Sequence, residues 1–187
     1  SPILYPNVNW YDYLMNKAAV QTQHNVSISG GTKDIRYFVS LGFLYQNGLF
    51  KQLDGLDYNN NYSYTRYNYR ANLDVNLTRT TTLKFGMGGI VGNQRDPGGS
   101  GNVWKQLTWS LPFSSPGIVD GKKVMTQSTR FPGVKMENQV FNGFYGYGYD
   151  RKVSNNMTFD LNLSQNLDCI TKGLSIEVKG AYNTDYS

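Results

Sequence analysis

The residue types that most often carry catalysis are scarce in this chain. His24 is the single histidine and Cys169 the single cysteine among 187 residues. General acid–base and nucleophilic catalysis both need a partner group within hydrogen-bonding reach, and neither residue has a candidate partner at suitable spacing. A zinc site needs several Cys or His ligands. The sequence therefore predicts no catalytic residue, no metal site and no cofactor, and it predicts a structural role for His24.

Two polar stretches imitate ligand-binding motifs. The segment "GFYGYGYD" (143–150) has the glycine spacing of a phosphate loop, but the strand–helix context that such a loop needs is missing. The segment "DGLDYNNN" (54–61) is rich in oxygen donors, yet it lacks the spaced acidic ligands and the final Glu of an EF-hand. We interpret both as loops and leave a calcium site at 54–61 as an open alternative.

Aromatic side chains in the long polar segments are the best candidates for binding. An exposed aromatic face can stack on a sugar ring or pack against a partner protein. The alternative is that these rings pack the loops on themselves. The candidate substrate or partner contacts are Trp10, Trp104, Trp109, Phe113, Tyr145 and Tyr147.

Composition excludes several classes of protein. Hydrophobic residues make up 39% of the chain and the mean hydropathy is -0.50, so no apolar run is long enough for a membrane-spanning helix. The net charge of +5 is scattered, without the basic stripe of a nucleic-acid groove. One cysteine excludes an internal disulfide framework. The first residues lack a signal-peptide pattern, so we expect a mature chain or a piece of a longer one.

A period of two recurs along the chain. In "RYNYRANLDVNL" (66–77), apolar and polar residues alternate almost without error, which places them on opposite faces of an extended strand. The segment "WYDYLMNKAA" (10–19) instead predicts a short helix. Five further segments show the alternation and bring the number of predicted strands to six: 24–30, 35–45, 82–91, 157–166 and 174–183.

Short and long connections alternate strictly between these strands. The connections at 30–34, 79–81 and 166–173 are short, whereas those near 47–66 and 95–150 are long. An outer-membrane barrel has this order, with short periplasmic turns and long extracellular loops. Six strands fall short of the eight that form the smallest common barrels. The fold class predicted is all-β, a segment of a larger transmembrane antiparallel barrel.

The two faces of the predicted strands suit lipid and water respectively. Aromatic residues near strand ends fit the girdles at the two membrane interfaces. Charged side chains on the polar face fit a water-filled or plug-filled lumen. The alternative is a soluble antiparallel sandwich, whose strands also alternate. The mid-strand charges of the polar face are Arg70, Asp74, Lys84, Asp160, Glu177 and Lys179.

Residues 7–50, "NVNWYDYLMNKAAVQTQHNVSISGGTKDIRYFVSLGFLYQNGLF", closely resemble SusC/RagA-type TonB-dependent outer-membrane transporters of Bacteroidetes. Members carry "DWYD", then "Q-x-H-N-x-S-x-S-G-G-x" and "Y-x-x-S-x-G-Y-x-x-Q-x-G". Asn9 replaces the usual Asp and Phe43 the usual Tyr, and the match is strongest over 7–91. The matching residues are Trp10, Tyr11, Asp12, Gln23, His24, Asn25, Ser27, Ser29, Gly30, Gly31, Tyr37, Ser40, Gly42, Gln46 and Gly48.

The resemblance implies a 22-stranded barrel that contains an N-terminal plug, is covered by a SusD-like surface lipoprotein and draws energy from TonB. Residues 1–22 would end an extracellular loop, with a possible short helix, and 23–187 would form a partial barrel; the plug would lie outside these residues. The implied function is import of glycan fragments or oligopeptides across the outer membrane of a Gram-negative bacterium, without enzymatic activity. The alternative is a soluble β-rich binding or adhesion module without transport.

Overall fold

The computed structural model describes residues 3, 6–52, 57–59, 61–98, 103–124, 126–127, 135–136 and 148–187. These residues form two compact units. The sheet unit comprises Gln21–Tyr45, Tyr64–Asn93 and Lys152–Ser187. The loop unit comprises Ser1–Val20, Gln46–Ser63 and Gln94–Arg151.

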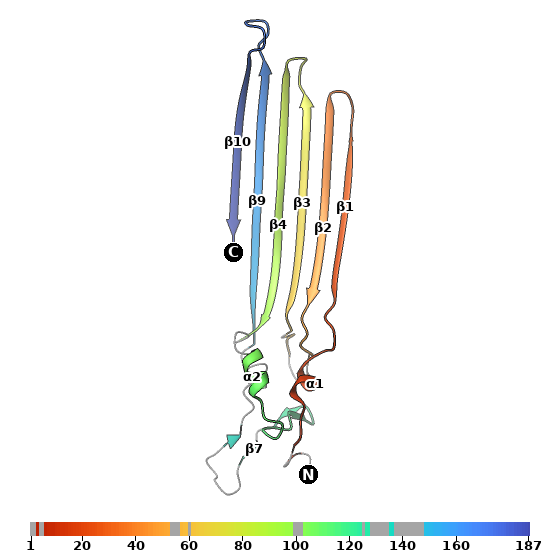
Figure 1. The fold of residues 1–187 in the computed structure, drawn as a ribbon, viewed down its shortest axis with the longest axis vertical. Helices are drawn as coiled ribbons and strands as arrows, with labels where there is room; N and C mark the ends of the chain where they lie inside the picture. Colours follow the sequence, from red (N-terminus) through yellow and green to blue (C-terminus); the bar gives the residue numbers. More distant parts are fainter. Residues whose placement is uncertain are drawn as a thin grey trace. The chain divides into compact units, whose positions relative to one another are not determined.

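Six long strands lie side by side in one antiparallel sheet, in the order β1-β2-β3-β4-β9-β10 (Figure 1). Each strand therefore pairs with its neighbour in the sequence, apart from the short elements between β4 and β9. All six predicted strands are confirmed, and most are longer than the alternating segments that predicted them. Their bounds are β1 Gln21–Gly31, β2 Ile35–Asn47, β3 Ser63–Asn76, β4 Thr81–Pro97, β9 Tyr149–Asn166 and β10 Ser175–Tyr186.

The register of β9 and β10 separates the two faces of the sheet. Val178 lies opposite Leu163, and at the next position along both strands Lys179 lies opposite Asn162. Because successive side chains point to opposite faces, apolar residues meet apolar residues on one face and polar residues meet polar residues on the other. The alternation read from the sequence is thus the alternation of the sheet.

The apolar face of the sheet unit is exposed. Val26 is 63% exposed, Leu41 60% and Val178 61%. Apart from the six-stranded sheet, the described residues form two ribbons of two short strands each, so they hold no second large sheet of the kind a sandwich requires. The ribbons are β5 (Ile118–Val119) with β6 (Lys122–Lys123), and β7 (Thr126–Gln127) with β8 (Lys135–Met136). A large exposed apolar surface marks a face that another phase or partner covers.

Three tight turns join the strands in pairs. The backbone N–H of Thr32 donates to the carbonyl of Ile35 at 2.6 Å, and that of Thr78 to Thr81 at 3.3 Å. In the third turn Leu167 donates to Leu174 at 2.8 Å. Antiparallel pairing places these three turns at one end of the sheet, and the connections β2–β3 and β4–β9 leave from the other end.

The connection β4–β9 begins and ends at two adjacent backbone positions. The N–H of Gly98 donates to the carbonyl of Gly148 at 2.9 Å, and Gly148 has a positive φ of 69°, which glycine adopts without steric cost. The connection contains helix α2 (Val103–Trp109) and the short strands β5 (Ile118–Val119), β6 (Lys122–Lys123), β7 (Thr126–Gln127) and β8 (Lys135–Met136).

The loop unit has a small hydrophobic core built around two helices. Helix α1 (Trp10–Leu14) is the predicted short helix; the Asn9 side chain caps it by accepting from the N–H groups of Tyr11 and Asp12. Within α2, Val103 and Leu107 are four residues apart and therefore share a face. Neither helix is long and apolar enough to cross a membrane, and no other helix occurs in the described residues. The buried cluster consists of Trp10, Leu14, Phe50, Val103 and Leu107.

Candidate functional site

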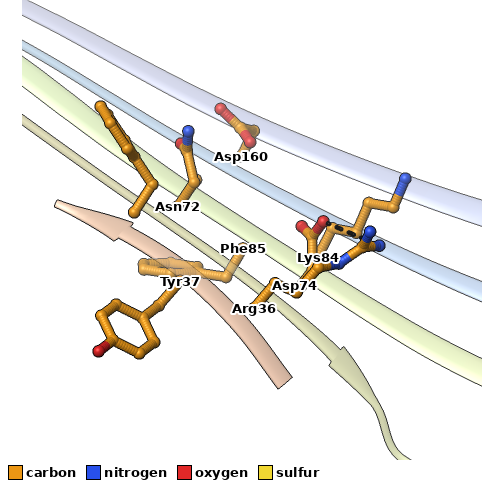
Figure 2. A pocket seen from close by; sticks show the side chains of 9 residues that line it. Arg36, Tyr37, Asn72, Asp74, Lys84, Phe85 and Asp160 are labelled. Carbon is orange, nitrogen blue, oxygen red and sulfur yellow. Dashed lines mark ion pairs between the residues drawn. The ribbon is translucent and has the colours of Figure 1, made fainter. Parts of the chain in front are cut away.

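A cleft of about 350 Å³ lies on the polar face of the sheet unit (Figure 2). Strands β2, β3, β4 and β9 each contribute to its lining. Its polar side chains are Arg36, Asn72, Asp74, Lys84 and Asp160. These residues come from four consecutive strands at neighbouring positions, as the hairpin order of the sheet requires.

Charges of opposite sign alternate across this face. The Arg36 guanidinium lies 3.7 Å from the Asp74 carboxylate (dashed in Figure 2). On the far strands, Lys179 pairs with Glu177 at 3.0 Å, and the Asn162 side chain donates to Glu177 at 2.7 Å. The charged side chains of the two ion pairs are between 36% and 74% exposed, so each pair contributes little to stability. The arrangement provides a hydrated wall of mixed charge rather than a concentrated site for an anion or a cation.

Gly86 on β4, which has no side chain, leaves room for the carboxylate of Asp160. Asp160 lies against Gly86, and a Cβ atom at position 86 would overlap its carboxylate. The glycine on β4 is therefore needed for close approach of the neighbouring strand's side chain rather than for an unusual backbone conformation.

An aromatic row crosses three strands on the opposite, apolar face. The His24 ring stacks on Phe43 with centroids 6.4 Å apart and an interplanar angle of 16°. The Phe43 ring in turn lies 5.4 Å from that of Tyr67. His24 thus stacks on one aromatic ring, that of Phe43. Cys169 is exposed in the 167–174 turn, far along the sequence from His24.

A second pocket, of about 390 Å³, lies within the loop unit. Trp104 forms one wall and is 54% exposed. Its ring contacts that of Phe50, with centroids 5.5 Å apart and an interplanar angle of 42°. Gln46 and Asp96 supply polar groups beside this aromatic wall. Sequence reasoning missed both polar residues, because they come from two strand ends that are 50 positions apart.

The structure separates the aromatic residues predicted as binding contacts. Trp10 is 3% exposed, and its indole N–H donates to the carbonyl of Leu111 at 3.1 Å, so it packs the loop unit instead of presenting a face. Trp109 is 72% and Phe113 54% exposed, but neither lines the Trp104 pocket. Tyr145 and Tyr147 lie outside the described residues.

Metal chemistry finds no support among the described side chains. They contain no group of three or more His, Cys, Asp or Glu residues placed to share an ion. Of the oxygen-rich segment 54–61, the structure describes 57–59 and 61, so the calcium alternative for the complete segment falls outside the described residues.

Comparison with known proteins relates the chain to TonB-dependent receptors. No protein-family model matches it. Over 121 residues it is 27% identical to TonB-dependent receptor P26 of Formosa agariphila, a match that covers 64% of this chain and 11% of that protein. Over 45 residues it is 47% identical to TonB-dependent receptor SusC of Bacteroides thetaiotaomicron, covering 24% of this chain and 4% of that protein.

A solved structure shares the fold. The structure of the RagAB peptide transporter superposes with a TM-score of 0.61 and 17% identity, and the match covers 96% of this chain and 19% of that chain. The chain thus spans about a tenth or less of the curated relatives it matches. The resemblance to SusC/RagA-type TonB-dependent transporters that the motifs predicted is confirmed by these matches.

Proposed function

We propose that this SusC/RagA-type segment is part of the wall of a 22-stranded outer-membrane barrel, and that the complete protein is a TonB-dependent nutrient importer. The observation that carries the proposal is the two-sided sheet. One face exposes apolar side chains such as Val26, Leu41 and Val178. The other carries ion pairs such as that between Arg36 and Asp74.

Lipid on one side and a lumen on the other account for both faces. Apolar side chains that face hydrocarbon are kept out of water by the lipid, so they need no cover of protein. Alternating charges that face a water-filled or plug-filled lumen stay hydrated. A sheet in lipid must close on itself, because unpaired edge groups there cost several kcal/mol each. The remaining strands and the plug belong to the parts of the complete protein outside this segment.

The aromatic row supports the same assignment. His24, Phe43 and Tyr67 lie in contact across β1, β2 and β3. Amphipathic rings concentrate where hydrocarbon gives way to headgroups. The row marks one membrane interface, on the side from which the long connections leave.

In the proposed orientation the three tight turns face the periplasm, and the loop unit lies outside the cell. The loop unit would then contact a SusD-like surface lipoprotein, and its exposed Trp109 and Phe113 are the candidate contacts. Substrate, a glycan fragment or an oligopeptide, would bind at this mouth. Displacement of the plug, driven through TonB, would let it pass along the charged face unchanged, so no enzymatic step is involved.

Transport by the complete protein in its native host tests the proposal. We expect uptake of the native substrate to stop when TonB is deleted, while binding of substrate to the cell surface persists. A strain that lacks the transporter itself is the control and should lose both uptake and binding. Uptake that continues without TonB would identify a passive porin and overturn the proposal.

A further inference from the structure

We infer that the pocket formed by Gln46, Asn47, Phe50, Tyr62, Asp96 and Trp104, here called the Trp104 pocket, binds a neutral sugar ring of the imported substrate. The inference rests on the proposed import function and deepens it, since it names the substrate class and the residues that select it. The pocket volume of about 390 Å³ lies within the range of ~300–1,000 Å³ that is typical of small-molecule sites.

Trp104 provides a platform for stacking. Phe50 is 6% exposed and belongs to the buried cluster of the loop unit. Because this buried ring contacts the indole of Trp104, the indole is supported from the core while about half of its surface remains open. A flat, electron-rich surface of this kind suits the C–H groups on one face of a pyranose.

Planar polar groups lie beside the platform. Gln94 donates from its side-chain amide to the Asp96 carboxylate at 2.8 Å, which fixes the carboxylate at the end of β4. Gln46 contributes an amide from the end of β2. Sugar hydroxyls both donate and accept, so a carboxylate and an amide together can bind a pair of them.

The floor of the pocket is held in place by backbone hydrogen bonds. The N–H of Asn47 donates to the carbonyl of Val20 at 3.0 Å, and the N–H of Gly48 to that of Tyr62 at 2.8 Å. The Val20 N–H donates to the Asn47 side chain at 2.7 Å. A Cβ atom at position 48 would overlap Tyr62. A pocket fixed before the ligand arrives loses little conformational entropy on binding.

The charge of the lining selects among substrates. The described lining contains one carboxylate, that of Asp96, and no Lys, Arg or His. A uronate or sulfate group would therefore meet the negative charge of Asp96, which no cation among the described lining residues offsets. This favours neutral sugars over acidic ones, and it leaves a cationic peptide side chain as the competing ligand that the test must separate.

Binding to the complete transporter purified in detergent tests the inference. The probes are neutral hexasaccharides of the malto, xylo and manno series, an oligogalacturonate and a lysine-containing hexapeptide, measured by calorimetry. We expect one neutral series to bind and Trp104→Ala to weaken that binding by ~2–10-fold, the range that aromatic contacts supply. Trp104→Phe should retain most of the affinity, and Asp96→Asn should reduce it.

Tyr11→Ala is the matched control. Tyr11 is an exposed aromatic residue on α1 that lies outside the pocket lining, so its removal should leave sugar affinity unchanged. Retention of affinity in Trp104→Ala, loss of peptide or galacturonate binding in that variant, or binding of none of the neutral sugars would each overturn the inference.

The two proposals fail differently. Uptake that requires TonB but is insensitive to Trp104→Ala would refute the pocket and leave the importer standing. Uptake that is independent of TonB, with sugar affinity still sensitive to Trp104→Ala, would refute the importer and leave the pocket.

Discussion

The Asp160 carboxylate on β9 lies against the backbone of Gly86 on β4, in space that any larger residue at 86 would occupy. The contact fixes two neighbouring strands at a defined position on the charged face. It also explains why glycine, which weakens strands in general, occupies this polar-face position of β4.

Gly86→Ala should therefore destabilise the barrel. The added methyl group must displace the carboxylate of Asp160, the outer end of an exposed side chain, so we expect a cost near the lower end of the ~1–3 kcal/mol range of overpacking. Urea unfolding of the complete protein in detergent measures the change. Gly180→Ala is the control, because a Cβ atom there meets nothing within 4 Å. Equal stability of the two variants would show that Asp160 is not confined by Gly86.

Arginine should be tolerated on one face of β3 and not on the other. Leu73→Arg places a charge on the proposed lipid face and should cost ~2–4 kcal/mol near the membrane midplane. Asn72→Arg, one position away, places the same group beside the charged cleft and should be mild. The fraction of folded barrel in isolated outer membranes measures both. Similar yields for the two variants would contradict the lipid assignment.

The native cysteine reports on orientation. Cys169 is exposed in the 167–174 turn, which we place in the periplasm. A membrane-impermeant thiol reagent should therefore label it after lysis and not on intact cells. In a background in which Cys169 and any other cysteine of the complete protein are replaced by Ser, Asp57→Cys in the β2–β3 connection should label on intact cells. The reverse pattern would invert the proposed topology.

The same turn should show a defined dependence on pH. The Gly173 backbone N–H and the Asn166 side-chain amide donate to Asp168 and hold the pKa of its carboxyl below its ordinary value. A lowered pKa means that the charged form favours the folded turn. The stabilisation is thus complete above the unfolded pKa of about 3.9 and is lost as pH falls through the folded pKa.

Asp168→Asn provides the comparison for that dependence. The stability difference between the wild-type protein and this variant should be present at neutral pH and shrink in acid below pH ~4. Unfolding midpoints of the complete protein at a series of pH values measure it. A difference that stays constant, or grows, as pH falls would show that the Gly173 and Asn166 contacts do not depend on the carboxylate charge.

The sheet could be predicted because its signal is local. In β3, the side chains of Leu73 and Asp74 point to opposite faces wherever the strand lies in the fold. The sequence of one segment is therefore enough to recognise a strand. Hairpin connections then pair each strand with its neighbour in sequence. The order β1-β2-β3-β4-β9-β10 requires no long-range information beyond the return of β9 to β4.

The loop unit could not be predicted in the same way. Helix α2 spans seven residues, too few to be stable alone, and it depends on Val103 and Leu107 packing with Trp10 and Phe50. That contact joins segments about 90 and 50 positions apart in a 187-residue chain. For the same reason Trp10, which as a tryptophan in a polar segment was a candidate contact, is buried, and Gln46 and Asp96 were not expected to share a pocket.

The hydrogen bond between Gly98 and Gly148 has a consequence for the evolution of such proteins. It brings the two ends of residues 99–147 together at adjacent backbone positions, so the pairing of β4 with β9 does not depend on what the intervening chain contains. The entropy cost of closing a loop rises slowly with its length, and surface connections accept insertions readily. The segment can therefore vary in length and sequence outside this core, whereas Val103 and Leu107, which pack with Trp10 and Phe50, tie it to the rest of the loop unit.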